Sequence, residues 1–437
     1  MKIFSTLCAA FAIIFLAQSC LVMEHKYTAV APGKWRAVLL LEDTKQGLGT
    51  KKEPAKNFEA VSQGELPFNF EVIYTDANNF YIELINGSER VKASEISIGR
   101  DRATGKDTLL VKFPAYDSYI KAIYEGNVMQ GKWVVASKEN YSIPFSARQG
   151  QDYRFSTLRK EPLTDISGTW EASFEDAGNP PEKAVGEFQQ KGNFLTGTFL
   201  TESGDYRYLE GTVQANKIYL SCFDGTHAFL FEGKLTDENN LTGFFKSGIH
   251  YKTTWSAKRN PQAALPDAYN ITKIIQPSKE INLDFLSSNN QKINLQNADY
   301  QGKVKIIQVS GTWCPNCKDE TNFLTNYIKN NNFDDLAIIG LYFERYKESE
   351  KANQHLEVYK KLMQIPWQIA FVGEASKETA SKSFPQIDKI RAFPTLLIVD
   401  KQNKIRLVHT GFSGPATSKY SEFAQNFDKL IRNLLKK

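Results

Sequence analysis

The sequence predicts a multidomain protein in which a β-rich N-terminal region, built as a meander or barrel, precedes an α/β domain. Its 437 residues are enough for two or three domains. Aromatic residues make up 12% of the chain, and short apolar segments separated by glycines run from Gly33 to Arg259 without a long helical period. Beyond them, an apolar run at Val304–Val309 leads into a helical pattern, which is typical of an α/β unit.

The first 19 residues resemble a lipoprotein-type signal peptide. Lys2 provides a short positive region, and Ile3–Ala17 is apolar but too short to span a bilayer comfortably. The run ends in Ser19-Cys20 and resembles a lipobox, although Leu16 stands four rather than three residues before the cysteine. We expect residues 20–27 to be a tether, with Cys20 lipidated and the protein anchored on the periplasmic side of the cell envelope. An ordinary cleaved signal peptide is the alternative.

Charge and cysteine content limit the classes of function that the protein can have. The net charge is +5 and the basic residues are spread out, so nothing indicates nucleic-acid binding. Of five cysteines, Cys8 leaves with the signal and Cys20 forms the anchor, so that Cys222, Cys314 and Cys317 remain. Few cysteines in an exported chain, two of them three residues apart, favour redox chemistry over a disulfide scaffold.

The β-rich region is expected as two halves, residues 28–160 and 161–260. Gly33-Lys34-Trp35 is echoed by Gly168-Thr169-Trp170, which indicates a weak tandem repeat or a chance similarity between meanders. Cys222 alternates with apolar neighbours and is expected in a core. The expected strands are Val38–Leu41, Phe70–Tyr74, Phe80–Ile85, Thr108–Phe113, Tyr119–Tyr124, Lys132–Ala136, Gly168–Phe174, Val185–Gln189, Leu195–Leu200, Tyr208–Val213, Lys217–Phe223, His227–Gly233 and Leu241–Lys246.

A proline- and alanine-containing linker at residues 261–276 separates this region from a last domain at 277–437. Its expected strands and helices follow one another at regular intervals: a hairpin at Asn282–Phe285 and Gln291–Leu295, strands Val304–Val309, Leu336–Phe343, Gln368–Val372, Thr395–Val399 and Ile405–His409, and helices Pro315–Asn330, Ser349–Met363 and Tyr420–Lys437.

The motif Trp313-Cys314-Pro315-Asn316-Cys317 carries the chemistry. Pro315 suits the first position of a helix, which places Cys314 at the helix N-terminus, where the dipole favours a nucleophilic thiolate. Cys317 lies close enough to form a disulfide with it and to resolve a mixed disulfide. Half a zinc site and a structural disulfide are the alternatives; the sequence contains no second pair of cysteines or histidines at zinc-ligand spacing.

Residues 277–437 resemble the thioredoxin-like domain of the TlpA/ResA group of bacterial thiol-disulfide oxidoreductases. The motifs that carry the resemblance are the W-C-x-x-C, Glu320 three residues after Cys317, and Phe393-Pro394-Thr395 before a strand. The resemblance implies a central mixed sheet flanked by helices. Gln308 departs from thioredoxin itself, which has a buried Asp at that position.

The same resemblance implies roles for single residues. It implies a cis Pro394 beside the thiols, a substrate strand that pairs with the backbone of Phe393, and substrate binding by Phe393, Thr395 and Trp313, with Trp313 next to the reactive thiol. It also implies that Glu320 takes the proton of Cys317, although a solvated carboxylate on the first helical turn is the alternative reading. On this basis Glu320→Gln should slow turnover, whereas Asp319→Asn should do little.

The expected function is therefore that of a membrane-anchored reductase of protein disulfides, without metal or organic cofactor, which draws electrons from an unidentified dithiol donor. One alternative is a binding lipoprotein whose β region carries the function. Another is a Sco-like copper-handling module, but that family uses C-x-x-x-C with a distant histidine, for which His409 is the only candidate. A peroxiredoxin-type peroxidase fails, because Ile307 and Gly311 stand where its Pro and Thr are required.

Overall fold

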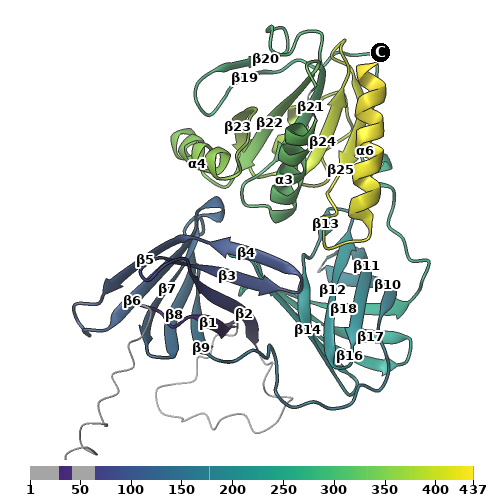
Figure 1. The fold of residues 1–437 in the computed structure, drawn as a ribbon. Helices are drawn as coiled ribbons and strands as arrows, with labels where there is room; N and C mark the ends of the chain where they lie inside the picture. Colours follow the sequence, from purple (N-terminus) through teal and green to yellow (C-terminus); the bar gives the residue numbers. More distant parts are fainter. Residues whose placement is uncertain (1–28, 42–63, 177, 332, 437) are drawn as a thin grey trace, which may run out of the picture.

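The computed structural model describes residues 29–41, 64–176, 178–331 and 333–436. Two β units lie side by side, and an α/β unit sits across both of them (Figure 1). The predicted signal segment, Cys20 and the tether lie outside the described residues. Within the described part of the chain, no helix is long and apolar enough to cross a membrane.

The first β unit is one antiparallel sheet in the order β4-β3-β2-β1-β9-β8-β7-β6-β5. Sequence patterns do not predict β5, whose residues are mostly exposed, or β9, which is interrupted by Pro144. The inner face buries Trp35, Phe68 and Trp133. The strands are β1 (Gly33–Leu40), β2 (Glu65–Tyr74), β3 (Phe80–Asn86), β4 (Glu89–Ala93), β5 (Glu95–Arg100), β6 (Asp107–Phe113), β7 (Ser118–Glu125), β8 (Val128–Val135) and β9 (Ser142–Gln149), with the short helix η1 (Pro114–Tyr116) between β6 and β7.

The second β unit is a closed barrel, because β11 pairs with β12 as well as with β10. Its interior is aromatic and holds Cys222, which is fully buried as predicted. The β-rich architecture expected from the sequence is thus confirmed. The strands are β10 (Gly168–Asp176), β11 (Asn179–Lys191), β12 (Phe194–Thr201), β13 (Gly204–Asp205), β14 (Leu209–Gln214), β15 (Lys217–Phe223), β16 (Ala228–Asp237), β17 (Asn240–Ser247) and β18 (Tyr251–Arg259).

The two β units begin with the same corner, which explains the repeated Gly-x-Trp. Gly33 and Gly168 have φ of 93° and 110°, a conformation that favours glycine. Two residues later, Trp35 and Trp170 each donate an indole N–H, at 2.9 Å, to the carbonyl four residues before them. Both indoles are fully buried. The echo between the halves therefore reflects a repeated local structure.

The two β units share one interface core. Phe223 of β15 packs its ring 4.4 Å from Phe68 of β2 and edge-on to Trp133. Arg154, which connects the units, is buried and lies 3.2 Å from a carboxylate oxygen of Glu210. The Asn86 side chain exchanges two hydrogen bonds with the Phe223 backbone. The two sheets are therefore packed as one body.

The α/β unit is built on a five-stranded sheet in the order β23-β22-β21-β24-β25, parallel between β21, β22 and β23 and antiparallel at β24 and β25. Successive residues of the central strands face different cores: Ile306 and Leu396 pack with helices α3, α4 and α6, whereas Ile307 packs with α5. Both faces are covered, so these strands read as continuous apolar runs. The elements are β19 (Asp284–Leu286), β20 (Lys292–Asn294), β21 (Val304–Ser310), α3 (Pro315–Asn330), β22 (Leu336–Glu344), α4 (Ser349–Leu362), β23 (Gln368–Glu374), α5 (Lys377–Lys382), β24 (Thr395–Val399), β25 (Ile405–Thr410) and α6 (Lys419–Leu435), after the short helix η2 (Ala268–Asn270).

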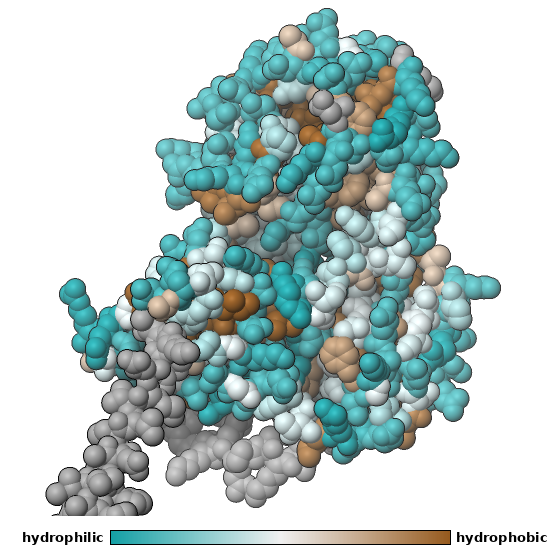
Figure 2. Space-filling model, viewed as in Figure 1, coloured by the Kyte–Doolittle hydropathy of each residue, from teal (hydrophilic) through white to brown (hydrophobic). Residues whose placement is uncertain are grey.

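The α/β unit contacts both β units. Lys318 of α3 lies over the ring of Tyr116 in η1, at 4.7 Å, and the Tyr346 hydroxyl donates to Asp117 at 2.9 Å. Glycines 204 and 411 mark close approaches of the second β unit to the segment after β25. Most of the face shown in Figure 2 is hydrophilic, as expected when the apolar residues lie inside the units and between them.

Candidate functional site

The two cysteines lie where β21 passes into α3. Cys314 is the N-cap of α3, and Pro315 occupies the first turn, where its missing N–H leaves no donor unsatisfied. The Cys317 N–H donates to Cys314 Sγ at 3.3 Å. A donor and a helix N-terminus directed at this sulfur stabilise negative charge on it.

The two thiols differ in exposure. Cys314 is 7% exposed, whereas Cys317 is fully buried, as the sequence predicts. Burial raises the pKa of the Cys317 thiol well above its ordinary value, and the neighbouring Cys314 and Glu320 raise it further. Cys314 is therefore placed to react with an incoming molecule, and Cys317 is placed to react with Cys314.

Glu320 lies on the buried side of α3, which excludes the solvated-carboxylate reading. It is fully buried, and its Oε2 accepts a hydrogen bond from Gln308 Nε2 at 3.0 Å. Its other oxygen, Oε1, has no hydrogen-bond partner among the described residues. Burial is the main reason that the pKa of Glu320 is raised well above its ordinary value; the Gln308 hydrogen bond opposes this shift, and the nearby Cys314 adds to it.

The Phe393–Pro394 peptide bond is cis. The Phe393 carbonyl lies 3.6 Å from Cys314 Sγ and accepts a hydrogen bond from this thiol. Thr395 differs from the expectation that it faces a substrate: it is fully buried, and its hydroxyl donates to the Ala392 carbonyl at 2.8 Å. Thr395 therefore holds the turn before β24, and Phe393 is the residue of this segment that contacts the reactive thiol.

Trp313 is fixed beside Cys314. Its indole N–H donates to the Phe343 carbonyl at 2.8 Å, and its ring packs edge-on to that of Phe393, at 5.5 Å. The guanidinium of Arg345 lies over the indole, 4.7 Å from the ring centre. The tryptophan is thus held next to the cysteine and next to a cation that the motif does not reveal.

Glu344 is a further residue of the site that sequence reasoning missed. It is buried at the end of β22 and accepts hydrogen bonds from both the backbone N–H and the hydroxyl of Thr312, each at 2.8 Å. Burial raises the pKa of Glu344 to about 7. His355 of α4 contacts the same hydroxyl at 3.1 Å. A single glutamate at the end of an apolar strand carries no recognisable spacing, so these anchors of the cysteine loop emerge only from the fold.

The second β unit reaches the cysteine motif directly. Asn316, between the two cysteines, donates from Nδ2 to the Asp205 carbonyl at 3.3 Å. The Asp205 carboxylate accepts the Gly414 N–H at 2.6 Å, and Gly204 bridges to Phe412. The turn from β12 to β13 therefore covers one side of the motif.

Cys314 opens into a cleft of about 460 Å³ that all three units line. The α/β unit contributes residues 313–316 and Arg345, the first β unit contributes Lys138, and the barrel mouth contributes the others, including Tyr206 and Phe229. Sequence reasoning attached no chemistry to the β region, because none of these residues forms a motif.

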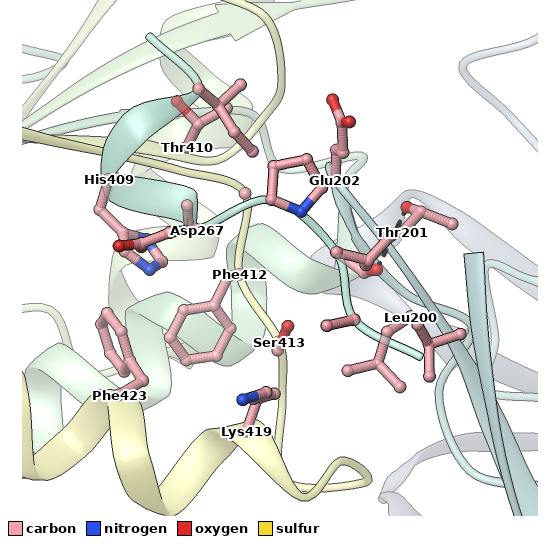
Figure 3. Close-up of a pocket in the computed structure, with 18 of the residues that line it drawn as sticks. Leu200, Thr201, Glu202, Asp267, His409, Thr410, Phe412, Ser413, Lys419 and Phe423 are labelled. Carbon is pink, nitrogen blue, oxygen red and sulfur yellow. Dashed lines mark hydrogen bonds between the residues drawn. The ribbon is translucent and has the colours of Figure 1, made fainter. Parts of the chain in front are cut away.

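A second cavity, of about 380 Å³, shares Thr201 and Gly204 with the cleft but is not lined by either cysteine. Figure 3 shows His409 and Phe423 on one side of it and Leu200 on the other. His409 is buried, and burial lowers its pKa to about 4. The only histidine considered for a copper site thus lines a cavity separate from that of Cys314.

Among the residues that the structure describes, no cluster of three or more His, Cys, Asp or Glu side chains is arranged to hold a metal ion. The described cysteines, Cys222, Cys314 and Cys317, are all free thiols.

No family model matches this chain, and no curated protein matches it. Several solved structures are similar to part of this chain. One is a thiol:disulfide interchange protein of the thioredoxin family from Chlorobium tepidum TLS, with 18% identity over 37% of this chain and 97% of that one, at a TM-score of 0.29.

Two others are a thiol-disulfide oxidoreductase from Bacteroides fragilis NCTC 9343 and an exposed lipoprotein thioredoxin from Streptococcus pneumoniae strain TIGR4. Their identities are 15% and 19%, each over 35% of this chain and 99% of that one, and both TM-scores are 0.27. Similarities this weak do not allow a substrate, partner or location to be inferred for this chain.

Proposed function

We propose that this protein is a thiol-disulfide oxidoreductase that reduces protein disulfides through Cys314 and Cys317. The observation that carries the proposal is the pairing of two unlike thiols at one helix start: Cys314 at the cleft with an N–H donor on its sulfur, and Cys317 buried behind it. The buried carboxyl group of Glu320 on the same helix supports an active rather than a structural cysteine pair.

The reaction proceeds in two exchanges. The Cys314 thiolate attacks one sulfur of the substrate disulfide, and the other substrate sulfur leaves as a thiolate and is protonated. Cys317 then gives its proton to Glu320 and attacks Cys314 Sγ, which releases the second substrate sulfur as a thiol. Two electrons pass from the dithiol to the substrate, so a separate dithiol donor must reduce the resulting Cys314–Cys317 disulfide.

Trapping the intermediate tests this proposal. In Cys317→Ala, Cys314 has no resolving partner, so a disulfide-bearing substrate should remain covalently attached to it. The adduct should be released by dithiothreitol and absent from Cys314→Ala. A Cys317→Ala protein that accumulates no mixed disulfide, or a Cys314→Ala protein that accumulates as much, contradicts the proposal.

We further propose that the protein is exported and anchored on the periplasmic side through a lipidated Cys20. The support comes from the sequence, in which an apolar run ends at Ser19-Cys20. Cys20→Ser should yield a released protein or an uncleaved precursor. Unchanged membrane fractionation and mature mass contradict the lipid anchor.

A further inference from the structure

The cleft beside Cys314 is lined by residues of two kinds. From the mouth of the barrel come aromatic side chains: the half-buried Tyr206 packs its ring 5.0 Å from that of Phe245. Phe229 packs against the same Phe245 ring at 5.5 Å. From the α/β unit come Cys314, Trp313 and Asn316. An occupant that spans the cleft would place an apolar group on the aromatic residues while its sulfur meets Cys314.

Lys138 and Arg345 both line this cleft, and the charge of the nearby buried Glu344 acts on Arg345. Lys138 lies 4.6 Å from the ring of Tyr141, and Arg345 lies 4.7 Å from the ring of Trp313. Within the described part of the chain, neither has a carboxylate within 4.0 Å. Burial and the nearby Arg345 lower the pKa of Lys138 to about 8.

The acidic residues of the cleft already have partners. Asp205 accepts the backbone N–H groups of Gly414 and Arg207, and Glu182 lies at the barrel end near Tyr206. His250 contacts the Tyr141 hydroxyl at 3.1 Å, and burial, with the charges of Lys138 and Arg345, lowers its pKa to about 4. The unneutralised charge beside Cys314 is thus positive.

The size of the opening sets a second limit. Cys314 is 7% exposed, and the turn at Gly204–Asp205 covers the Asn316 side of the motif. The cleft volume of about 460 Å³ lies within the range of ligand pockets. The small exposed area of Cys314 therefore favours a slim, extended segment over a disulfide set in a rigid protein surface.

We propose that the cleft selects an extended, cysteine-bearing peptide segment with acidic side chains next to the cysteine of its disulfide. This inference rests on the proposed function and adds its substrate class. The acidic groups meet Lys138 and Arg345, an adjacent apolar side chain meets Tyr206 and Phe229, and the slim backbone passes the turn at Gly204–Asp205.

Two short peptides test the charge selection. They carry the same cysteine, joined in a disulfide to the same reporter thiol, flanked either by glutamates or by lysines. The fully reduced protein should reduce the acidic peptide about tenfold faster at low ionic strength, and the ratio should fall toward one in 0.5 M salt, as expected for exposed charges. Lys138→Glu should reverse or abolish the preference. Lys132→Glu, an exposed change on β8 outside the cleft, should leave it intact.

The outcomes separate this inference from the function beneath it. If both peptides are reduced at equal rates and neither is reduced by Cys314→Ala, the charge selection is wrong and the proposed oxidoreductase activity stands. If both peptides are reduced at equal rates and Cys314→Ala reduces them just as fast, the proposed oxidoreductase activity of the cysteine pair is wrong. Reduction of hydroxyethyl disulfide, a small uncharged disulfide without a peptide backbone, as fast as the acidic peptide overturns the peptide as occupant. Equally fast reduction of a rigid folded protein with a surface disulfide overturns the size restriction.

Discussion

At the scale of single residues, the site depends on two unlike thiols. Cys314 and Cys317 are separated by one helical turn, yet only Cys314 lines the cleft. Because the thiolate is the reactive form, the raised pKa of Cys317 makes it a poor nucleophile until a base removes its proton.

Alkylation of single-cysteine variants should reveal this difference. We expect Cys314 in Cys317→Ala to react with iodoacetamide at least about tenfold faster at pH 7 than Cys317 in Cys314→Ala, because Cys317 is buried and protonated. Rates measured against pH by mass spectrometry provide the test. A faster reaction of Cys317 would reverse the assigned roles.

Replacing Glu320 should affect turnover and folding stability in different ways. Glu320→Gln should slow turnover about tenfold or more and remove the part of the pH profile that rises as Glu320 ionises. Folding raises the pKa of Glu320 above its value in the unfolded chain. The folded protein therefore loses stability as the pH rises from the unfolded-state pKa of Glu320 through its folded-state pKa. The variant should therefore be as stable as the parent, or more so, at neutral pH. Turnover against pH and thermal unfolding measure the two effects.

The matched control for this experiment is Glu378→Gln, whose carboxylate is 82% exposed on α5. An equal loss of turnover in both variants, or an unchanged pH profile in Glu320→Gln, argues against a proton acceptor. Asp319→Asn is unsuitable, contrary to the expectation from sequence that it should do little. The Asp319 carboxylate is mostly buried and paired with Arg207 of the second β unit.

At the scale of elements, the turn between β12 and β13 governs access to the cysteine motif. A methyl group added at Gly204 would collide with the Asn316 side chain, and the backbone there has φ of 147°. The turn therefore depends on glycine for both conformation and space.

Substituting this glycine should open the covered side of the motif. We expect Gly204→Ala to increase the alkylation rate of Cys314 several-fold, because Asn316 and the turn must move apart. Gly192→Ala, in the neighbouring β11–β12 turn, shares a positive φ but meets nothing within 4 Å, so it controls for backbone strain. Equal alkylation rates in the two variants would show that the turn does not restrict access.

At the scale of the whole molecule, one buried arginine joins the three units. Arg207 of the second β unit pairs with Glu89 of the first and with Asp319 of the α/β unit, and its Nε lies 3.5 Å from Asp224. Its side chain is 6% exposed. Removing one partner from such a cluster leaves uncompensated buried charges, which costs more than the cluster contributes as a whole.

Arg207→Ala should therefore lower the unfolding free energy by about 3–5 kcal/mol. Because the lost contacts lie between units, calorimetry should show the α/β unit separating from the β units as a distinct transition. Lys382→Ala, which breaks an exposed pair with Glu378, should cost about 0–1 kcal/mol. A small, single-transition effect of Arg207→Ala would mean that the cluster does not hold the units together.

The local chemistry of the site was predictable from sequence, because it depends on neighbours along the chain. The apolar run at Val304–Val309 and the proline after Cys314 predict the strand and helix, and the spacing of Cys317 and Glu320 places both on one helix face. The raised pKa of Cys317 follows from that placement. The spacing alone left Glu320 open to a solvated position, and the fold buries it. Alternation and glycine positions likewise predict most strands of the β units.

The surroundings of Cys314 were decided by tertiary structure alone. Lys138, Asp205 and Arg345 lie in three units far apart in the sequence, and neither composition nor spacing indicates that they meet. The same holds for the pairing of Asp319 with Arg207 and for the buried position of Thr395. Periodicity reports which face of an element is buried, but not which element buries it. That choice comes from packing and charge pairing between distant segments, and here it makes a solvent-facing motif the floor of a cleft.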